Sequence, residues 1–298
     1  MTARAGAVRS VRAVAARVRS MRAAAAVALG SLGVLGPCLP AHAAFECEWP
    51  DARAAVAVGA VEPWAVRVLG AIGDAAGEPN ASPRWSFALS GGELFGLREA
   101  RGAAAETALD AGGTHLAFRA ATFGSPLYAE RTLAVQCARR VSDGLVCGAR
   151  LRALGVAADG CESAWSFAVD ASMAARVTGL LALGGRFDNV SASEIGGSPV
   201  ASSAVVGASL ELDRVTLEAG IRIEEGFDAA PLLSVDAAVG EWLSVRAGAD
   251  GGPGAFGVGL GVGGGRGATT GSRPAVDVAW RWHPELGVSS FVSVRFGP

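Results

Sequence analysis

The stretch Ala204–Glu224, AVVGASLELDRVTLEAGIRIE, predicts two strands joined by a tight turn at Asp213-Arg214. In each half every second residue is apolar, and the positions between are mainly polar, charged or glycine. Since side chains alternate across a strand, each half has one apolar and one polar face. A helix would instead mix Glu218 and Arg222 with the aliphatic side chains. The stretch therefore predicts an antiparallel hairpin whose apolar face contacts either a second protein layer or lipid.

The composition of the chain departs from that of an average soluble domain. The 298 residues are 51% hydrophobic and 18% charged, and they include 42 glycines. Average soluble domains have about 25% charged residues and about 7% glycine. The formal net charge of −2 offers no basic excess to a polyanion, so we expect no nucleic-acid partner.

Residues 1–43 have the pattern of a secretory signal peptide. Several arginines precede an uncharged run at 23–36, and the Ala-His-Ala of residues 41–43 matches an A-x-A cleavage site. The apolar run is too short to span a bilayer as a helix. We predict an exported protein whose translation starts at Met21 and whose mature chain begins near Ala44.

Four cysteines remain after the predicted cleavage: Cys47, Cys137, Cys147 and Cys161. Their spacing matches neither a zinc site nor a small disulfide framework. Cys137 and Cys147 fall on the apolar faces of neighbouring predicted strands, so we expect both to act as small apolar side chains. A disulfide between Cys47 and Cys161 is left open.

The rest of the chain is predicted to be strand after strand. Ala54–Val61 and Trp85–Leu89 are expected to be strands, and residues 92–109 are expected to be partly helical. We therefore expect a signal peptide at 1–43, an N-terminal segment at 44–112 with one or two strands and a plug or short helix, and main barrel strands at 113–298. The strands predicted from Thr114 onward are 114–123, 130–141, 145–156, 163–174, 177–187, 203–213, 214–224, 232–239, 241–250, 255–263, 274–283 and 286–296.

Charge parity favours a membrane barrel over a soluble sandwich. From Ala204 onward the strand charges share the parity of the less apolar face. A charge facing lipid near the bilayer midplane costs about 2–4 kcal/mol, so a membrane barrel excludes it. A sandwich also alternates, but here the polar face is rich in glycine and the apolar face is unbroken. Most predicted strands approach the 9–11 residues that a tilted strand needs to cross a bilayer. We predict an all-β fold, an antiparallel transmembrane β-barrel of about 12–14 strands.

Parity identifies one set of candidate residues, and position near the strand ends identifies a second. The predicted lumen-facing residues are Arg150, Arg152, Asp170, Glu211, Glu218, Arg222, Asp236, Arg246, Asp277, Arg281 and Arg295. The predicted aromatic residues at the membrane interfaces are Phe123, Trp165, Phe187, Trp242, Trp280, Trp282 and Phe296. The charged set has two interpretations, a solute path or a cross-strand ion-pair network that closes the lumen, and we favour the network.

Predicted connection lengths also alternate. The longer connections are 124–129, 157–162, 188–202, 225–231, 251–254 and 284–285, and the shorter ones are 142–144, 175–176, the 213/214 junction and Gly240, with 264–273 as the exception. Short periplasmic turns and longer outer loops are typical of outer-membrane barrels. We therefore expect the 213/214 turn to face the periplasm.

No stretch predicts an enzyme, a cofactor site or a metal site. Residues 259–264, GLGVGG, match G-x-G-x-x-G, but a dinucleotide site needs a helix directly after the motif, and a turn-like segment follows here. The histidines left after cleavage, His115 and His283, have no metal-ligand spacing. We expect the alternate glycines to leave room in the lumen.

Three stretches resemble a known family. They are Phe123–Glu130 (FGSPLYAE), Gly185–Val190 (GRFDNV) followed by Ile195-Gly196, and Trp282–Ser289 (WHPELGVS). They are similar to segments of the PorV/PorQ-type outer-membrane barrels, relatives of the FadL-like long-chain fatty-acid transporters. In that family F-G-x-x-x-Y-x-E leads a strand and H-P-x-L-G opens the last one. The resemblance implies a barrel of about fourteen strands.

The resemblance also implies a setting and partners. The partners it implies are outer-membrane lipid, the barrel-assembly machinery, and a hydrophobic solute or secretion-system subunits. We predict a non-enzymatic bacterial outer-membrane barrel that handles passage of a solute or of a secretion partner. The alternatives are a closed structural or docking barrel of a secretion or envelope complex and a soluble secreted β-sandwich.

Overall fold

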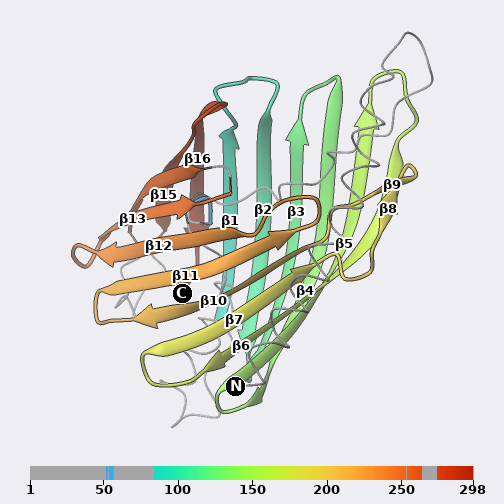
Figure 1. The fold of residues 1–298 in the computed structure, drawn as a ribbon. Helices are drawn as coiled ribbons and strands as arrows, with labels where there is room; N and C mark the ends of the chain where they lie inside the picture. Colours follow the sequence, from blue (N-terminus) through green and yellow to red (C-terminus); the bar gives the residue numbers. More distant parts are fainter. Residues whose placement is uncertain (1–51, 53, 57–83, 253, 264–273, 298) are drawn as a thin grey trace, which may run out of the picture.

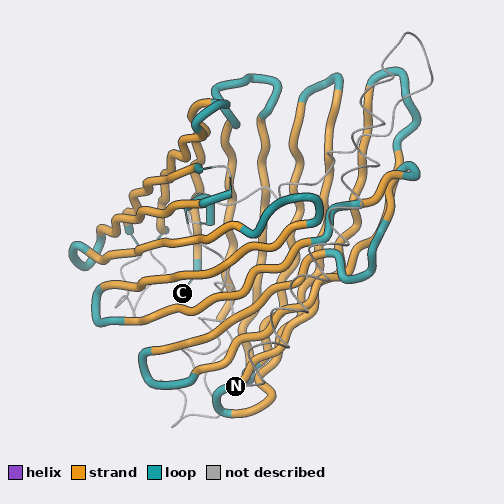
Figure 2. Tube along the Cα trace, viewed as in Figure 1, coloured by secondary structure: helices purple, strands orange, loops and turns teal. Residues whose placement is uncertain are grey.

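Alternating apolar and small or polar residues build one closed antiparallel barrel (Figure 1). The computed structural model describes residues 52, 54–56, 84–252, 254–263 and 274–297. Within them the barrel has fourteen strands and no helix (Figure 2). The strands are β1 (Arg84–Glu93), β2 (Arg101–Ala111), β3 (Thr114–Gly124), β4 (Tyr128–Ser142), β5 (Leu145–Ala158), β6 (Ala164–Arg176), β7 (Leu181–Asp188), β10 (Ser203–Glu211), β11 (Val215–Glu224), β12 (Ala230–Ala238), β13 (Leu243–Asp250), β14 (Ala255–Val262), β15 (Ala275–His283) and β16 (Gly287–Phe296).

Neighbouring strands in sequence are neighbours in the barrel, with two exceptions. β7 pairs with β10, because the short pair β8 (Glu194–Ile195) and β9 (Ser198–Pro199) forms a separate two-stranded sheet. β1 pairs with β16 and closes the barrel. At that closure Phe87 lies opposite Phe296, with their ring centroids 6.4 Å apart.

The hairpin at Ala204–Glu224 has the predicted register. Ala204 lies opposite Ile223 and Leu210 opposite Leu217, so the apolar sides of β10 and β11 share one face. The Leu212 N–H donates to the Val215 carbonyl at 2.8 Å across Asp213-Arg214. The predicted turn is confirmed.

Large apolar side chains cover the outside of the barrel. Phe167, Val206, Ile221, Leu233 and Val258 are all exposed, and each lies on the face opposite to the inward charges. Among the described strand residues whose side chains are placed, the outward face carries charge only near strand ends. Those residues are Glu93, Arg101, Arg131 and Arg139. The middle of the outer surface is therefore an uncharged apolar belt.

The connections define two ends of the barrel. The long-loop end carries 94–100, 125–127, 159–163, 189–202, 225–229, 251–254 and 284–286; the short-turn end carries 112–113, 143–144, 177–180, 212–214, 239–242 and 263–274. The turns at 177–180 and 239–242 are longer than predicted, because β7 begins at Leu181 rather than 177 and β13 at Leu243 rather than 241. Residues 264–273 of the last connection lie outside the described part.

The N-terminal predictions need correction. Residues 92–109 were expected to be partly helical, but they contain the end of β1, the turn 94–100 and most of β2. Ala54–Val56 are turn residues rather than strand, and 57–61 lie outside the described residues, as does the predicted signal peptide. Tertiary pairing makes this segment a strand, because β1 and β3 pair with β2 on its two sides.

The cysteines behave in two ways. Cys137 and Cys147 are free and exposed on the outward faces of β4 and β5, as predicted. Cys161, in the 159–163 loop, is disulfide-bonded. Cys47, the partner that the sequence left open, lies outside the described residues.

Candidate functional site in the barrel lumen

The inner face of the barrel collects every charged residue that parity predicted to face the lumen. Cross-strand register places Arg150 opposite Asp170 and Asp236 opposite Arg246, both on the face opposite to the apolar belt. Most of these side chains form ion pairs. Three groups result, on different arcs of the wall.

The first group, here called the β5–β7 cluster, comprises Arg150, Arg152, Asp170, Arg186 and Asp188. Asp170 accepts hydrogen bonds from Arg150 and Arg152, both at 2.7 Å. Asp188 accepts from Arg150 at 3.2 Å and from Arg186 at 3.0 Å. Arg152 and Asp170 are only 6% and 2% exposed. Burial makes such a pair costly to break, since one charge would be left without compensation.

The second group crosses β12, β13, β15 and β16. Arg246 donates to Asp236 at 2.9 Å and also to Asp277. Asp277 in turn accepts from Arg295. Arg246 and Asp277 are buried, so this chain of charges ties four strands together from the inside.

The third group lies toward the long-loop end. Asp250 accepts from Arg222 at 3.0 Å and from Arg281 at 2.8 Å. The Arg281 side chain keeps 34% of its surface exposed, so solvent reaches this group. Of the predicted residues in none of the groups, Glu211 pairs with Arg176 at 3.6 Å and Glu218 accepts from the Ser234 hydroxyl at 2.9 Å.

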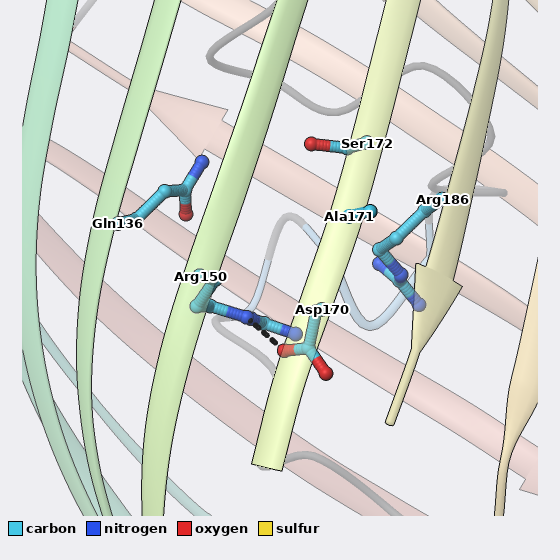
Figure 3. A pocket seen from close by; sticks show the side chains of 6 residues that line it. All are labelled: Gln136, Arg150, Asp170, Ala171, Ser172 and Arg186. Carbon is cyan, nitrogen blue, oxygen red and sulfur yellow. Dashed lines mark hydrogen bonds and ion pairs between the residues drawn. The ribbon is translucent and has the colours of Figure 1, made fainter. Parts of the chain in front are cut away.

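A hollow opens beside the β5–β7 cluster (Figure 3). Its polar lining side chains come from four neighbouring strands. Its lining residues are Gln136, Arg150, Asp170, Ala171, Ser172 and Arg186.

A short piece of the N-terminal segment lies inside the barrel. We call the described residues 52 and 54–56 the lumen segment. A Cβ on Gly248 would lie 2.0 Å from the Val56 carbonyl oxygen, and a Cβ on Gly257 would lie 3.3 Å from Val56 Cγ2. Glycine on the inner faces of β13 and β14 therefore makes room for this segment. The apolar cluster around it comprises Ala52, Ala55, Val56, Ala104, Ala279 and Phe291, with Leu94, Ala121 and Phe123 packed against it.

The 189–202 connection also folds onto the inner wall. Ile195 and Val200 are buried against the inward-facing Leu154 and Ala168. The connection starts at Asn189, which has a φ of 53°, a conformation that asparagine tolerates. The Asn189 N–H donates to Asp170 at 2.8 Å. Asp170 thus links the β5–β7 cluster to this inward-folded loop.

The predicted interface aromatics divide unevenly. Trp165, Phe187, Trp242, Trp280, Trp282 and Phe296 are exposed. Phe123 was predicted among them, but it packs inward against the cluster around the lumen segment. Phe123 faces inward because the strand register places it opposite Glu130 and Gly102, on the inner face of β3.

Several inward residues escaped the sequence analysis. Arg186 and Asp188 complete the β5–β7 cluster, and Asp250 bridges two arginines. Arg119 also pairs with Glu106 at 3.2 Å across β2 and β3. Strand parity could have found Arg186 and Arg119. Asp188 and Asp250 are the last residues of β7 and β13. An error of one residue in the predicted strand end leaves it undecided whether such a residue faces the lumen.

The described residues contain no arrangement that marks a cofactor site. Gly259 and Gly261 lie within β14 and its inward stripe rather than before a helix. In the described part of the chain no three His, Cys, Asp or Glu side chains gather to hold a metal ion. The described part of the chain also contains no helix that is long and apolar enough to cross a membrane.

Comparison with known proteins finds structural likeness alone. No protein-family model matches the sequence, and no curated protein matches it. The CymD monoaromatic hydrocarbon channel is similar at a TM-score of 0.48 and 12% identity, covering 72% of this chain and 87% of that one. The Ralstonia pickettii toluene transporter TbuX is similar at a TM-score of 0.46 and 10% identity, covering 72% of this chain and 88% of that one. The KdgM porin is similar at 0.42 and 8%, covering 71% and 98%.

The PorV/PorQ-type resemblance stays a prediction. The chain is a closed fourteen-stranded antiparallel barrel with an apolar outer belt and a charged lumen.

Proposed function

We propose that the protein is a non-enzymatic outer-membrane β-barrel that passes a solute through its lumen. The observation that carries the proposal is the apolar belt, whose outward charges lie only near strand ends among the described residues. Soluble proteins seldom expose apolar surface of this extent. A lipid-facing barrel surface requires it.

The lining of the lumen favours passage of a polar or charged solute. A purely structural barrel would not require polar groups that water can reach on its inner wall. Arg281 and Arg222 remain partly exposed on the inner wall, and the hollow beside the β5–β7 cluster is lined by polar groups. Water-accessible polar groups on the inside and apolar groups on the outside are the arrangement of a channel-forming barrel.

A closed docking barrel is the second candidate. It is favoured by the lumen segment, which packs Val56 against the wall, and by the density of ion pairs. In this candidate the ion-pair network stabilises a closed lumen, and a secretion or envelope partner binds at the ends.

Two measurements separate these candidates. A detergent extract of the outer membrane run with and without heating should show the heat-dependent migration of a folded barrel. The purified protein in planar bilayers should then give stepwise conductance. A heat-modifiable barrel without conductance would favour the docking barrel, and recovery of the protein only in the soluble periplasm would overturn both.

A further inference from the structure

We infer that the outer surface of β3–β6, near the long-loop end, binds the phosphate of a lipid in the surrounding leaflet. The ligand class is a phosphorylated glycolipid, whose phosphate contacts Arg131 and whose acyl chains lie along the apolar belt. The inference goes beyond passage of a solute, and of the proposed function it uses only the membrane location.

Two arginines on the outer surface have no acidic partner among the described residues. Of the outward charges on the described strands, Glu93 and Arg101 pair with each other at 3.2 Å. The other two, Arg131 and Arg139, are exposed, and neither forms an ion pair with a described residue. Each guanidinium can therefore bind an anion outside the barrel, and phosphate oxygens match its planar fork.

Arg131 and Arg139 lie at opposite borders of the apolar belt. They are eight residues apart on β4, and the outward residues between them are Leu133, Val135 and Cys137. At about 3.4 Å per residue and a tilt of about 40°, eight residues rise about 21 Å along the membrane normal. The apolar band of such a barrel is about 25 Å tall, so each guanidinium can extend into a headgroup layer. Arg131 is nearer the long-loop end, which faces the outer leaflet in this class of barrel.

Arg131 lies in a row of outward residues that suits a lipid headgroup. We call this the outer row; direct register across four strands joins its members Thr122, Arg131, Gly155 and Trp165. A Cβ on Gly155 would lie 2.8 Å from the Trp165 ring, so the indole covers the residue that separates it from Arg131. A hydroxyl and a guanidinium both donate to phosphate oxygens, and tryptophan is enriched at the interface between membrane and water.

The next row toward the middle of the belt is apolar. Leu133, Ala153 and Phe167 lie opposite one another across β4–β6. Leu133 and Phe167 are both exposed on the outer surface. A lipid whose phosphate binds the outer row would therefore place its acyl chains on this second row.

The test measures lipid binding and does not require conductance. The full mature protein, purified in detergent, would be titrated with diphosphorylated lipid A and, separately, with a synthetic analogue that has the same acyl chains and no phosphate. Native mass spectrometry gives the apparent Kd of the first bound lipid. We expect the wild type to bind lipid A more tightly than the analogue. Arg131→Gln should weaken binding of lipid A by about tenfold, as expected for the loss of a charge-assisted hydrogen bond, and leave binding of the analogue unchanged.

The matched control is Arg139→Gln, which makes the same change of charge on the same face of β4 at the opposite border. The row of Arg139 continues through Thr114, Cys147 and Met173 rather than through a tryptophan, so the affinity for lipid A should not change. Equal affinity of the wild type for the two lipids, or equal weakening by the two substitutions, would overturn the site. Phosphate-dependent binding without conductance in bilayers would leave the site standing and contradict the channel function.

Discussion

At the scale of single residues, Ile221 and Arg222 are neighbours in β11 that face opposite environments. Ile221 is 52% exposed on the outer belt, whereas Arg222 pairs with Asp250 inside the barrel. Ile221→Arg should place a charge in lipid at a cost of up to about 2–4 kcal/mol near the midplane. We expect this variant to assemble far less heat-modifiable barrel in the outer membrane than Arg222→Ala does. Equal tolerance of the two substitutions would mean that the outer face does not lie in lipid.

A second residue-scale prediction concerns Asp170. Asp170→Asn leaves the buried Arg152 guanidinium without its ion-pair partner, which should cost about 3–5 kcal/mol. Urea unfolding of the detergent-folded barrel, followed by tryptophan fluorescence, measures this loss. The matched control is Glu93→Gln, which alters the exposed pair with Arg101 and should cost about 0–1 kcal/mol. A similar cost for both variants would show that the cluster does not stabilise the wall.

The facing of individual side chains was predictable from sequence, but their partners were not. Parity alone placed Glu218, Arg246 and Asp277 inside. The pairing of Arg246 with Asp277 joins residues that are distant in sequence through β14, so it depends on register across three strands. Phe123 was misplaced for a related reason, because its position near a strand end suggested an interface residue while its parity turned it inward.

At the scale of elements, the inward glycines of β13 and β14 form the seat of the lumen segment. Gly248→Ala would place a methyl group on the Val56 carbonyl oxygen, and a backbone atom cannot yield as a flexible side chain can. We expect the segment to leave its seat. The measurement is the rate at which a Val56→Cys thiol reacts with a water-soluble maleimide, in a background where Cys137 and Cys147 are serine.

The rate should rise when Gly248→Ala is added. Gly91→Ala is the control, because the nearest heavy atom to its Cβ is the Gly102 oxygen at 3.5 Å. Unchanged labelling in Gly248→Ala would show that the glycine does not seat the segment.

Strand elements with β-branched or aromatic side chains were predictable, and alanine-rich ones were not. The predicted strands from Thr114 onward match the structure to within a few residues, except that β7 starts four residues late. β2 contains the run AAAETA, whose local preference is helical, and it becomes a strand because β1 and β3 flank it. Ala54–Val56 showed the alternation of a strand, yet they lie as a turn in the lumen, a placement that depends on the finished barrel.

At the scale of the whole molecule, the barrel reverses the usual arrangement of a soluble protein. Its large apolar side chains lie outside and its charges lie inside, paired across strands. The alternation that predicted the strands also occurs in a sandwich. Charge parity predicted a barrel, but it did not predict which strands close it, since the β1–β16 pairing joins the first and last described strands.

The outward apolar surface in lipid is the central claim, and accessibility along β11 tests it most directly. Spin labels at single cysteines replacing residues 217–223 one at a time, in the protein reconstituted into lipid vesicles, would be exposed to oxygen and to a water-soluble nickel chelate. Labels at Leu217, Ala219, Ile221 and Ile223 should respond to oxygen, and labels at the residues between should be protected from it, giving a period of two. Access of the nickel chelate to the labels at Ala219 and Ile221 would contradict a membrane barrel.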